Sequence, residues 1–165
     1  MQADYIIIES TYGNSLHDEH SPSVDVLEEW ITKTCLKKKG KLIIPAFSVG
    51  RTQELLYSLN QLELENRLPD LEYFVDSPLS TKATHIVKRF PQYFNKRIQK
   101  VLMGDSDPFN FKGLKFIKSV EESKLLNYKN GPCVIISASG MAEAGRVKHH
   151  ISNNIENSRN TILLT

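Results

Sequence analysis

The sequence predicts an α/β fold, a parallel Rossmann-like sheet with helices on both of its faces. Short apolar runs rich in β-branched residues alternate along the chain with longer segments of helical spacing, which is typical of βαβ units. The runs are unbroken, as expected for strands that are covered on both faces. The chain has 165 residues, 40% of them apolar, which is enough for one domain with its own core.

Six segments are predicted to be strands, and they are rich in isoleucine, leucine, valine and aromatic residues. In order they span 5–8, 42–44, 72–75, 114–117, 134–136 and 161–164, of which 114–117 is the weakest. A polar residue or a proline directly follows the first, second, third and fifth runs. We therefore expect polar groups where these strands end.

The first predicted helix begins at the Ser-Pro pair at 21–22, because serine is a good N-cap and proline suits the first helical position. Leu27, Ile31 and Cys35 then repeat at helical spacing. Gly40, which follows three lysines, is expected to end the helix.

Four further helices are predicted after it. Leucines at 55, 56, 59 and 62 mark the second, and Ser77-Pro78 begins the third by the same capping logic. The capping-box spacing at 119–122 begins the fourth, and 142–155 forms the fifth. The turn-rich stretch 105–113 is predicted to be a loop.

Composition limits the function only weakly. The net charge of +2 is too small to indicate nucleic-acid binding by itself. The two cysteines, Cys35 and Cys133, have no zinc-site spacing and are expected to be reduced thiols in a cytoplasmic protein. No apolar run reaches the roughly 18 residues of a membrane span, and no signal peptide is recognisable. Since the sequence starts and stops almost inside predicted strands, we expect residues 1–165 to be one domain of a longer chain.

Ligands bind outside the carboxyl ends of the strands in open parallel sheets. Glu9, Arg51, Asp76 and Ser139 follow four of the predicted strands, so we expect them to line one rim. Glu9 could act as a general acid–base partner, orient a histidine, or fix the following turn as a cap or ion pair. Its spacing does not decide among these roles.

The segment from Ser137 to Arg146 has the small residues of an anion site, followed by a helix whose amide N–H groups could face a phosphate. Gly140 and Gly145 have P-loop spacing, but Arg-Val at 146–147 replaces the required Lys and Ser/Thr. The segment therefore argues against a P-loop that hydrolyses nucleotides. An alternative for Gly140 is a tight turn that needs a positive φ.

The remaining candidates are individual polar residues. Arg51 lies at a helix start, where a cation is disfavoured, so it should have a partner such as a phosphate or Asp76. A simple ion pair and a ligand contact are both open. One residue of the pair His149-His150 should face the sheet and the other the solvent, in structural roles. The metal-like segment 17–20, His-Asp-Glu-His, has no supporting cluster elsewhere. A serine hydrolase would need Ser139 beside a histidine and an acid, and the G-x-S-x-G elbow is missing.

Four segments in this order resemble the β-CASP domain of metallo-β-lactamase-fold ribonucleases. They are Glu-Ser-Thr-Tyr-Gly at 9–13 followed by His17; Pro-Ala-Phe-Ser-Val-Gly-Arg-Thr-Gln-Glu at 45–54; Asp-Ser-Pro-Leu at 76–79; and Ser-Ala-Ser-Gly-Met at 137–141 followed by Gly145-Arg146 and His149-His150. Each segment is moderately specific, and together they cover the chain from about residue 6 to 164.

This resemblance implies a function for the parent protein. Enzymes of the family cut RNA, or in some branches DNA, and include the endonuclease subunit of the pre-mRNA cleavage and polyadenylation complex. Their β-CASP domain is inserted into a metallo-β-lactamase domain and closes over its active site as a lid. Two zinc ions in that domain activate water, and their ligands include a His-x-His-x-Asp-His segment that this sequence lacks.

For this chain the resemblance implies no metal site and no cofactor of its own, and an isolated chain that is inactive. Its partners would be RNA and the metallo-β-lactamase domain of the same parent. Glu9 would be the acid of the first β-CASP motif, paired with a histidine that is absent here. Phosphate contacts are expected from residues near the rim: Ser48, Arg51, Ser139, Gly140 and Arg146. The alternative is a stand-alone α/β module that binds a nucleotide or another anion.

Overall fold

A computed structural model of the chain describes residues 3–11, 13–14 and 24–164. Within them, five strands form one sheet in the order β3-β2-β4-β1-β5, and every neighbouring pair is parallel. The strands are β1 (Lys41–Pro45), β2 (Glu72–Asp76), β3 (Leu114–Phe116), β4 (Cys133–Ser137) and β5 (Thr161–Ile162). The predicted parallel α/β fold is confirmed.

Helices connect the strands. They are α1 (Val24–Ile31), which continues into the π-helical turn η1 (Thr32–Lys37), α2 (Arg51–Leu64), α3 (Pro78–Val87), the 3₁₀ turn η2 (Pro91–Tyr93), α4 (Lys96–Val101), α5 (Val120–Tyr128) and α6 (Arg146–Asn154). None of the described helices is long and apolar enough to cross a membrane.

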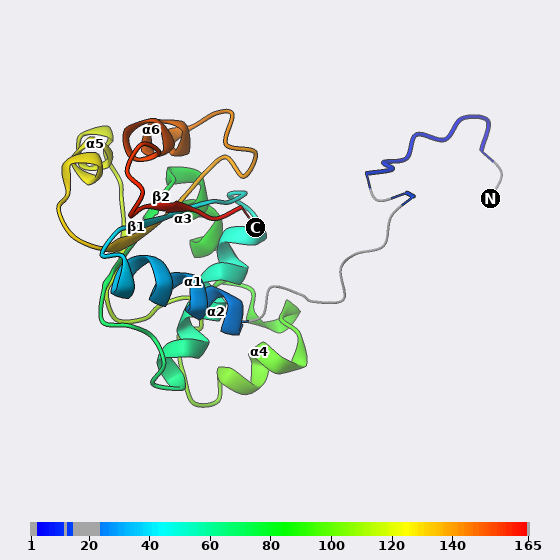
Figure 1. Cartoon of the computed structure of the whole chain (residues 1–165). Helices are drawn as coiled ribbons and strands as arrows, with labels where there is room; N and C mark the ends of the chain where they lie inside the picture. Colours follow the sequence, from blue (N-terminus) through cyan, green and yellow to red (C-terminus); the bar gives the residue numbers. More distant parts are fainter. Residues whose placement is uncertain (1–2, 12, 15–23, 165) are drawn as a thin grey trace.

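The helices lie on both faces of the sheet because successive strands are added first toward one edge of the sheet and then toward the other. From β1 the chain moves through β2 to the edge strand β3, then returns to β4 and ends at β5 on the other edge. Right-handed connections that run in opposite directions lie on opposite faces. Accordingly, α5 and α6 pack together on one face, and α1 and α2 pack together on the other (Figure 1).

Alternate side chains of the central strands enter two apolar clusters. Leu42 and Ile44 of β1 pack with the buried leucines of α2 on one face. Cys133 and Ile135 of β4 pack with Leu126 of α5 on the other. Every residue of β1 and β4 is buried, which explains why these runs carry no alternation of polar residues.

The predicted strand over 5–8 is wrong for this chain. Ile6, Ile7 and Ile8 are 78%, 102% and 80% exposed, and the segment forms no strand. A β-branched run becomes a strand only where a second strand offers hydrogen bonds, and no strand lies beside this one in the described structure. In Figure 1 the segment, in blue, lies apart from the sheet.

Other differences are local. The first helix ends with Lys39 in the left-handed region, at φ 57°, so Gly40 does not supply the stop that was predicted. The fifth helix begins at Arg146, four residues later than predicted, because 138–145 form a loop. The short helices η2 and α4 were not predicted. The Ser-Pro pair at 21–22 lies outside the described residues.

Candidate functional site

The carboxyl edge of the sheet brings three strand ends together. Strand β4 lies between β2 and β1, and the connections that leave these two neighbours run over the face opposite to α6. Where neighbouring connections leave on opposite faces, the loops at the carboxyl ends diverge and form a crevice. Parallel sheets bind ligands in such crevices. In the sheet register, Ser137 lies between Asp76 and Pro45 at this edge.

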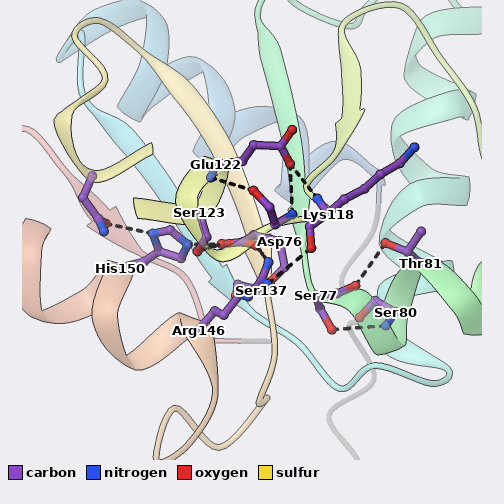
Figure 2. Close-up of polar contacts among 12 residues, drawn as sticks. Asp76, Ser77, Ser80, Thr81, Lys118, Glu122, Ser123, Ser137, Arg146 and His150 are labelled. Atoms are coloured by element: carbon purple, nitrogen blue, oxygen red, sulfur yellow. Dashed lines mark hydrogen bonds and ion pairs between the residues drawn. The ribbon is translucent and has the colours of Figure 1, made fainter. Parts of the chain in front are cut away.

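Asp76 is the centre of a buried polar network at the end of β2 (Figure 2). Its carboxylate accepts hydrogen bonds from Ser123 Oγ at 2.5 Å and from the Arg146 guanidinium at 2.6 Å. The Nε2 atom of His150 lies 2.6 Å from the same carboxylate. Ser137 Oγ donates to the backbone carbonyl of Asp76 at 2.8 Å. The network therefore joins β2, β4, α5 and α6.

Burial alone raises the pKa of the Asp76 carboxyl, since Asp76 is fully buried. The hydrogen bonds from His150, Ser123 and Arg146 outweigh burial and hold this pKa below its usual range. Asp76 is therefore ionised at neutral pH, and its charge is compensated by Arg146 at 2.6 Å. Asp76 therefore forms a buried ion pair with Arg146 and is not a solvent-accessible carboxylate.

His150 is fully buried, whereas His149 is exposed, which confirms that one histidine faces the sheet and the other the solvent. The Nδ1 atom of His150 lies 2.9 Å from Asn127 Oδ1, so both ring nitrogens have partners. With both nitrogens engaged, the ring acts as a bridge between α6, β2 and α5. The structural role predicted for this histidine is thereby supported.

Arg51 does not pair with Asp76, so that alternative is wrong. Its guanidinium binds Glu54 at 2.9 Å on the surface of α2, and its side chain is 38% exposed. Arg146 takes the place beside Asp76 because α6 follows β4, which lies next to β2. Local sequence gives no indication of this neighbour relation, although Arg146 and His150 are four residues apart on one helix face.

The hydroxyls expected at the rim lie near one another. Ser48 Oγ and Ser77 Oγ are 3.3 Å apart, across the ends of β1 and β2. Ser77 Oγ also accepts the Ser80 amide at 3.1 Å, which confirms the predicted N-cap of α3. Four apolar residues that follow the ends of β1, β2 and β4 are more than half exposed: Phe47, Val49, Leu79 and Met141. The rim is thus a mixed surface of hydroxyls and apolar groups.

Several backbone amides in and next to the loop 138–145 donate hydrogen bonds to acceptors within that loop. Ser139 N–H donates to the Ala144 carbonyl at 3.1 Å, and Val147 N–H donates to the Ala138 carbonyl at 3.2 Å. Met141 N–H donates to Ser139 Oγ at 3.3 Å. The Val147 amide belongs to the first turn of α6, whose N–H groups were expected to face a phosphate, and it is engaged by this loop instead.

Gly140 is required by close packing and not by a positive φ, so the tight-turn alternative is wrong. A Cβ atom at this position would lie 2.8 Å from the Phe47 ring and 3.0 Å from the Phe47 amide nitrogen. Gly145, in contrast, has a φ of 76°, and a Cβ atom there would lie 2.4 Å from the Ala138 carbonyl oxygen. The two glycines let the loop fold against the end of β1.

Glu9 is not part of this rim. Its carboxylate accepts the Thr11 amide at 3.0 Å, and the Gly13 amide donates to the Ser10 carbonyl at 2.9 Å. In the described structure Glu9 therefore acts as a cap of the turn that follows it, and its catalytic role remains a prediction. Tyr12 and the segment 17–20 lie outside the described residues.

Two alternatives concern chemistry at this edge. Ser139 Oγ accepts the Met141 amide, and among the described residues it is hydrogen-bonded to neither a histidine nor an acid, as a serine nucleophile would need. In residues 3–11, 13–14 and 24–164, no group of three or more His, Cys, Asp or Glu side chains could hold a metal ion.

Comparison with known proteins gives consistent matches. The Beta-Casp domain family matches residues 52–165. The chain is 34% identical over 161 residues to ribonuclease TTHA0252 of Thermus thermophilus, covering 98% of this chain and 37% of that protein. It is 32% identical over 168 residues to an RNase J-like protein of Methanocaldococcus jannaschii, covering 99% of this chain and 37% of that protein. It is 29% identical over 167 residues to cleavage and polyadenylation specificity factor subunit 3 of Dictyostelium discoideum, covering 99% of this chain and 20% of that protein. The chain thus spans between 20% and 37% of the length of these relatives.

Proposed function

This chain belongs to the Beta-Casp domain family, and from that premise we propose that it is the RNA-binding lid domain of a larger zinc-dependent nuclease. The parent would hydrolyse RNA phosphodiester bonds, as the ribonuclease names of the relatives suggest. The proposal places residues 1–165 in one domain of that parent. Its second domain would have the metallo-β-lactamase fold and carry the catalytic metals.

The observation that carries this proposal is the exposed run Tyr5–Ile8, in which each side chain is at least 78% exposed. Burial of an isoleucine side chain contributes about 1.5–3 kcal/mol, so leaving three of them in water is unfavourable. An extended apolar run of this kind can add to the edge of another sheet. We assign it as a strand of the metallo-β-lactamase domain, which would bring Glu9 to the end of that strand.

The apolar rim supports the same arrangement. Phe47, Val49, Leu79 and Met141 expose more than half of their surface at the carboxyl edge. Clusters of exposed apolar side chains mark interaction surfaces. We propose that this edge faces the catalytic domain, with RNA in the cleft between the two domains.

The RNA contacts are proposed for Ser48, Arg51, Ser139, Gly140 and Arg146. Arg51 is the most available cation of the set, because it pairs with a single exposed carboxylate. Arg146 contacts Asp76 and the Lys118 carbonyl, so it contributes mainly by fixing the loop that carries Ser139. Because this set contains two cations, of which Arg146 is paired with Asp76, phosphate binding should be weak and sensitive to salt.

The catalytic chemistry would come from the second domain. The described residues of this chain offer no cluster of metal ligands, so we place both zinc ions in that domain. Two zinc ions there would supply the activated water. Glu9 would pair with a histidine of that domain and help to protonate the leaving oxygen. We place the parent in the cytoplasm, which suits the two free thiols of Cys35 and Cys133.

The test compares isolated residues 1–165 with the parent protein. We expect the isolated chain to cleave no single-stranded RNA and to hold no stoichiometric zinc. In the parent, Glu9→Ala should lower cleavage greatly and leave the zinc content unchanged. Two tightly held zinc ions per isolated chain, or full turnover of the Glu9 variant, would refute the proposal.

A second variant tests the docked strand. Ile7→Asn should leave the thermal midpoint of the isolated chain unchanged, because Ile7 is 102% exposed there. In the parent the same change should lower the midpoint, since the side chain would be buried. The matched control is Ile155→Asn, at the C-cap of α6, where the residue is 61% exposed. This change should shift the thermal midpoint by the same amount in the isolated chain and in the parent. Equal effects of Ile7→Asn in both proteins would exclude the docked strand.

A further inference from the structure

A cavity of about 510 Å³ opens at the amino ends of β1, β4 and β5. It lies at the sheet edge opposite to Asp76, which strands of five residues separate by roughly 15 Å. Four cations and no carboxylate line it: Lys39, Lys41, Lys129 and Arg159. The rest of the lining is mainly asparagine, glycine and one tyrosine, so the cavity is positively charged and rich in amides.

Lys41 is a buried cation without an acidic partner in the described part of the chain. It is 8% exposed, and its ammonium donates to the Leu126 and Asn127 carbonyls, each at 3.0 Å. An ammonium has three donors, so one remains for another acceptor. Burial lowers the pKa of Lys41, which means that its charge is held at a cost. A bound anion would reduce that cost.

Close backbone packing places two more cations at the cavity. A Cβ atom on Gly40 would lie 2.0 Å from the Arg159 carbonyl oxygen, so only glycine allows these two segments to touch. The Lys41 amide also donates to Asn160 Oδ1 at 2.8 Å. Lys39 and Arg159, which flank this contact, are both exposed, and neither is among the ion pairs of the described residues.

The fourth cation is different, since Lys129 forms an ion pair with Glu72. Glu72 also binds Lys115 at 2.6 Å, and these two lysines hold the pKa of the Glu72 carboxyl below its usual value. The charge of Lys129 is therefore already neutralised by Glu72. The free positive charge of the cavity comes from Lys39, Lys41 and Arg159.

One wall of the cavity carries an aromatic ring. Tyr128, the last residue of α5, is 80% exposed and lies in the lining beside the asparagines. An exposed aromatic ring next to a positively charged groove is the arrangement on which nucleic-acid bases stack. Asparagine side chains can both donate to and accept from the edge of a base.

We propose that this cavity is a nucleotide-binding site, with phosphate held by Lys39, Lys41 and Arg159 and the base stacked on Tyr128. The site lies away from the rim assigned to the catalytic cleft and does not rest on the proposed nuclease function. A free mononucleotide and one nucleotide of a single-stranded RNA share this chemistry. The test has to separate these two sources.

Binding to isolated residues 1–165 is measured with AMP, with inorganic phosphate and with a short labelled single-stranded RNA at several salt concentrations. The double variant Lys39→Gly/Arg159→Ala removes two cations, and glycine suits the φ of 57° at position 39. The slope of log K against log salt for the RNA should become shallower by about 1.4, at 0.7 per phosphate contact. Tyr128→Ala should lower the affinity for both AMP and RNA by about tenfold.

The matched control is Lys100→Ala, an exposed lysine of α4, which should leave affinity and salt slope unchanged. AMP that displaces the RNA and binds more tightly than phosphate supports the site, and the ratio of the AMP and RNA affinities tells which source it prefers. Wild-type affinity and slope in the double variant would overturn the proposal. The proposal would also be overturned if phosphate bound as tightly as AMP and Tyr128→Ala left the AMP and RNA affinities unchanged. RNA cleavage by the parent has no part in this test, so its outcome is separate from that of the nuclease proposal.

Discussion

Replacing Asp76 by asparagine tests whether the buried network holds the carboxyl edge together. Asparagine keeps the shape of the side chain but removes the charge that Arg146 neutralises at 2.6 Å. It also places an amide among three donor groups, those of Ser123, Arg146 and His150. Breaking one partner of a buried ion pair costs about 3–5 kcal/mol, because the other charge stays buried without compensation.

We therefore expect Asp76→Asn to lower the free energy of unfolding by about 3–5 kcal/mol. For a domain whose total is about 5–15 kcal/mol, this is a large share. Urea unfolding can be followed by the fluorescence of Trp30, the single tryptophan, which packs against the core. The control is Asp70→Asn, since Asp70 is 82% exposed in its ion pair with Lys112 and should change stability by no more than about 0.5 kcal/mol.

The same network predicts a dependence on pH. The pKa of Asp76 is lowered in the folded state, so its ionisation stabilises the fold above the unfolded pKa of about 4. That contribution is lost as the pH falls through the lower, folded pKa. Unfolding free energies of the wild type should fall steeply below about pH 4, and those of Asp76→Asn should fall less. A variant that stays within about 1 kcal/mol of the wild type at neutral pH, with the same acid profile, would refute this reasoning.

Three further outcomes follow from the packing and exposure of single residues. Gly140→Ala should destabilise the domain by about 1–3 kcal/mol in urea unfolding, because its Cβ would lie 2.8 Å from the Phe47 ring. Burial raises the pKa of Cys35 to about 12 and that of Cys133 to about 11, so an aromatic disulfide reagent at pH 8 should label both thiols only after unfolding. Arg51→Ala should change the free energy of unfolding by no more than about 0.5 kcal/mol, and if Arg51 contacts phosphate it should make the salt slope of RNA binding by the parent shallower by about 0.7. An unaltered slope would leave Arg51 only its surface ion pair.

Local patterns were sufficient to predict most elements of the fold. The runs at the centre of the sheet are apolar without interruption, and both β1 and β4 are buried at every position. The capping box predicted at 119–122 is present: Ser119 Oγ accepts the Glu122 amide at 3.0 Å, and Glu122 accepts the Ser119 amide at 3.1 Å. Such signals involve residues within one turn of each other, so they need no knowledge of the tertiary structure.

Features that depend on the order of the strands could not be predicted. The choice of Arg146 instead of Arg51 as partner of Asp76 follows from β4 lying beside β2, which the sequence order does not give. The isoleucines at 6–8 have the composition of a strand, yet pairing depends on a neighbour that the described structure does not supply. The short helix α4 is rich in Lys, Arg and Gln and has no buried residue, so it lacks the apolar face that would have marked it.

The two edges of the sheet differ in how their charges are satisfied, and this difference bears on where phosphate can bind. At the carboxyl edge, the buried carboxylate of Asp76 already holds Arg146, and the amides of the loop that follows β4 are bonded to that loop. Phosphate at this edge must therefore rely on Arg51, on hydroxyls and on groups from the proposed second domain. At the amino edge, Lys41 is buried, and no carboxylate lines the cavity around it. The isolated chain should consequently bind nucleotides mainly through the amino edge, whereas the carboxyl edge should contribute only in a parent that carries the proposed second domain.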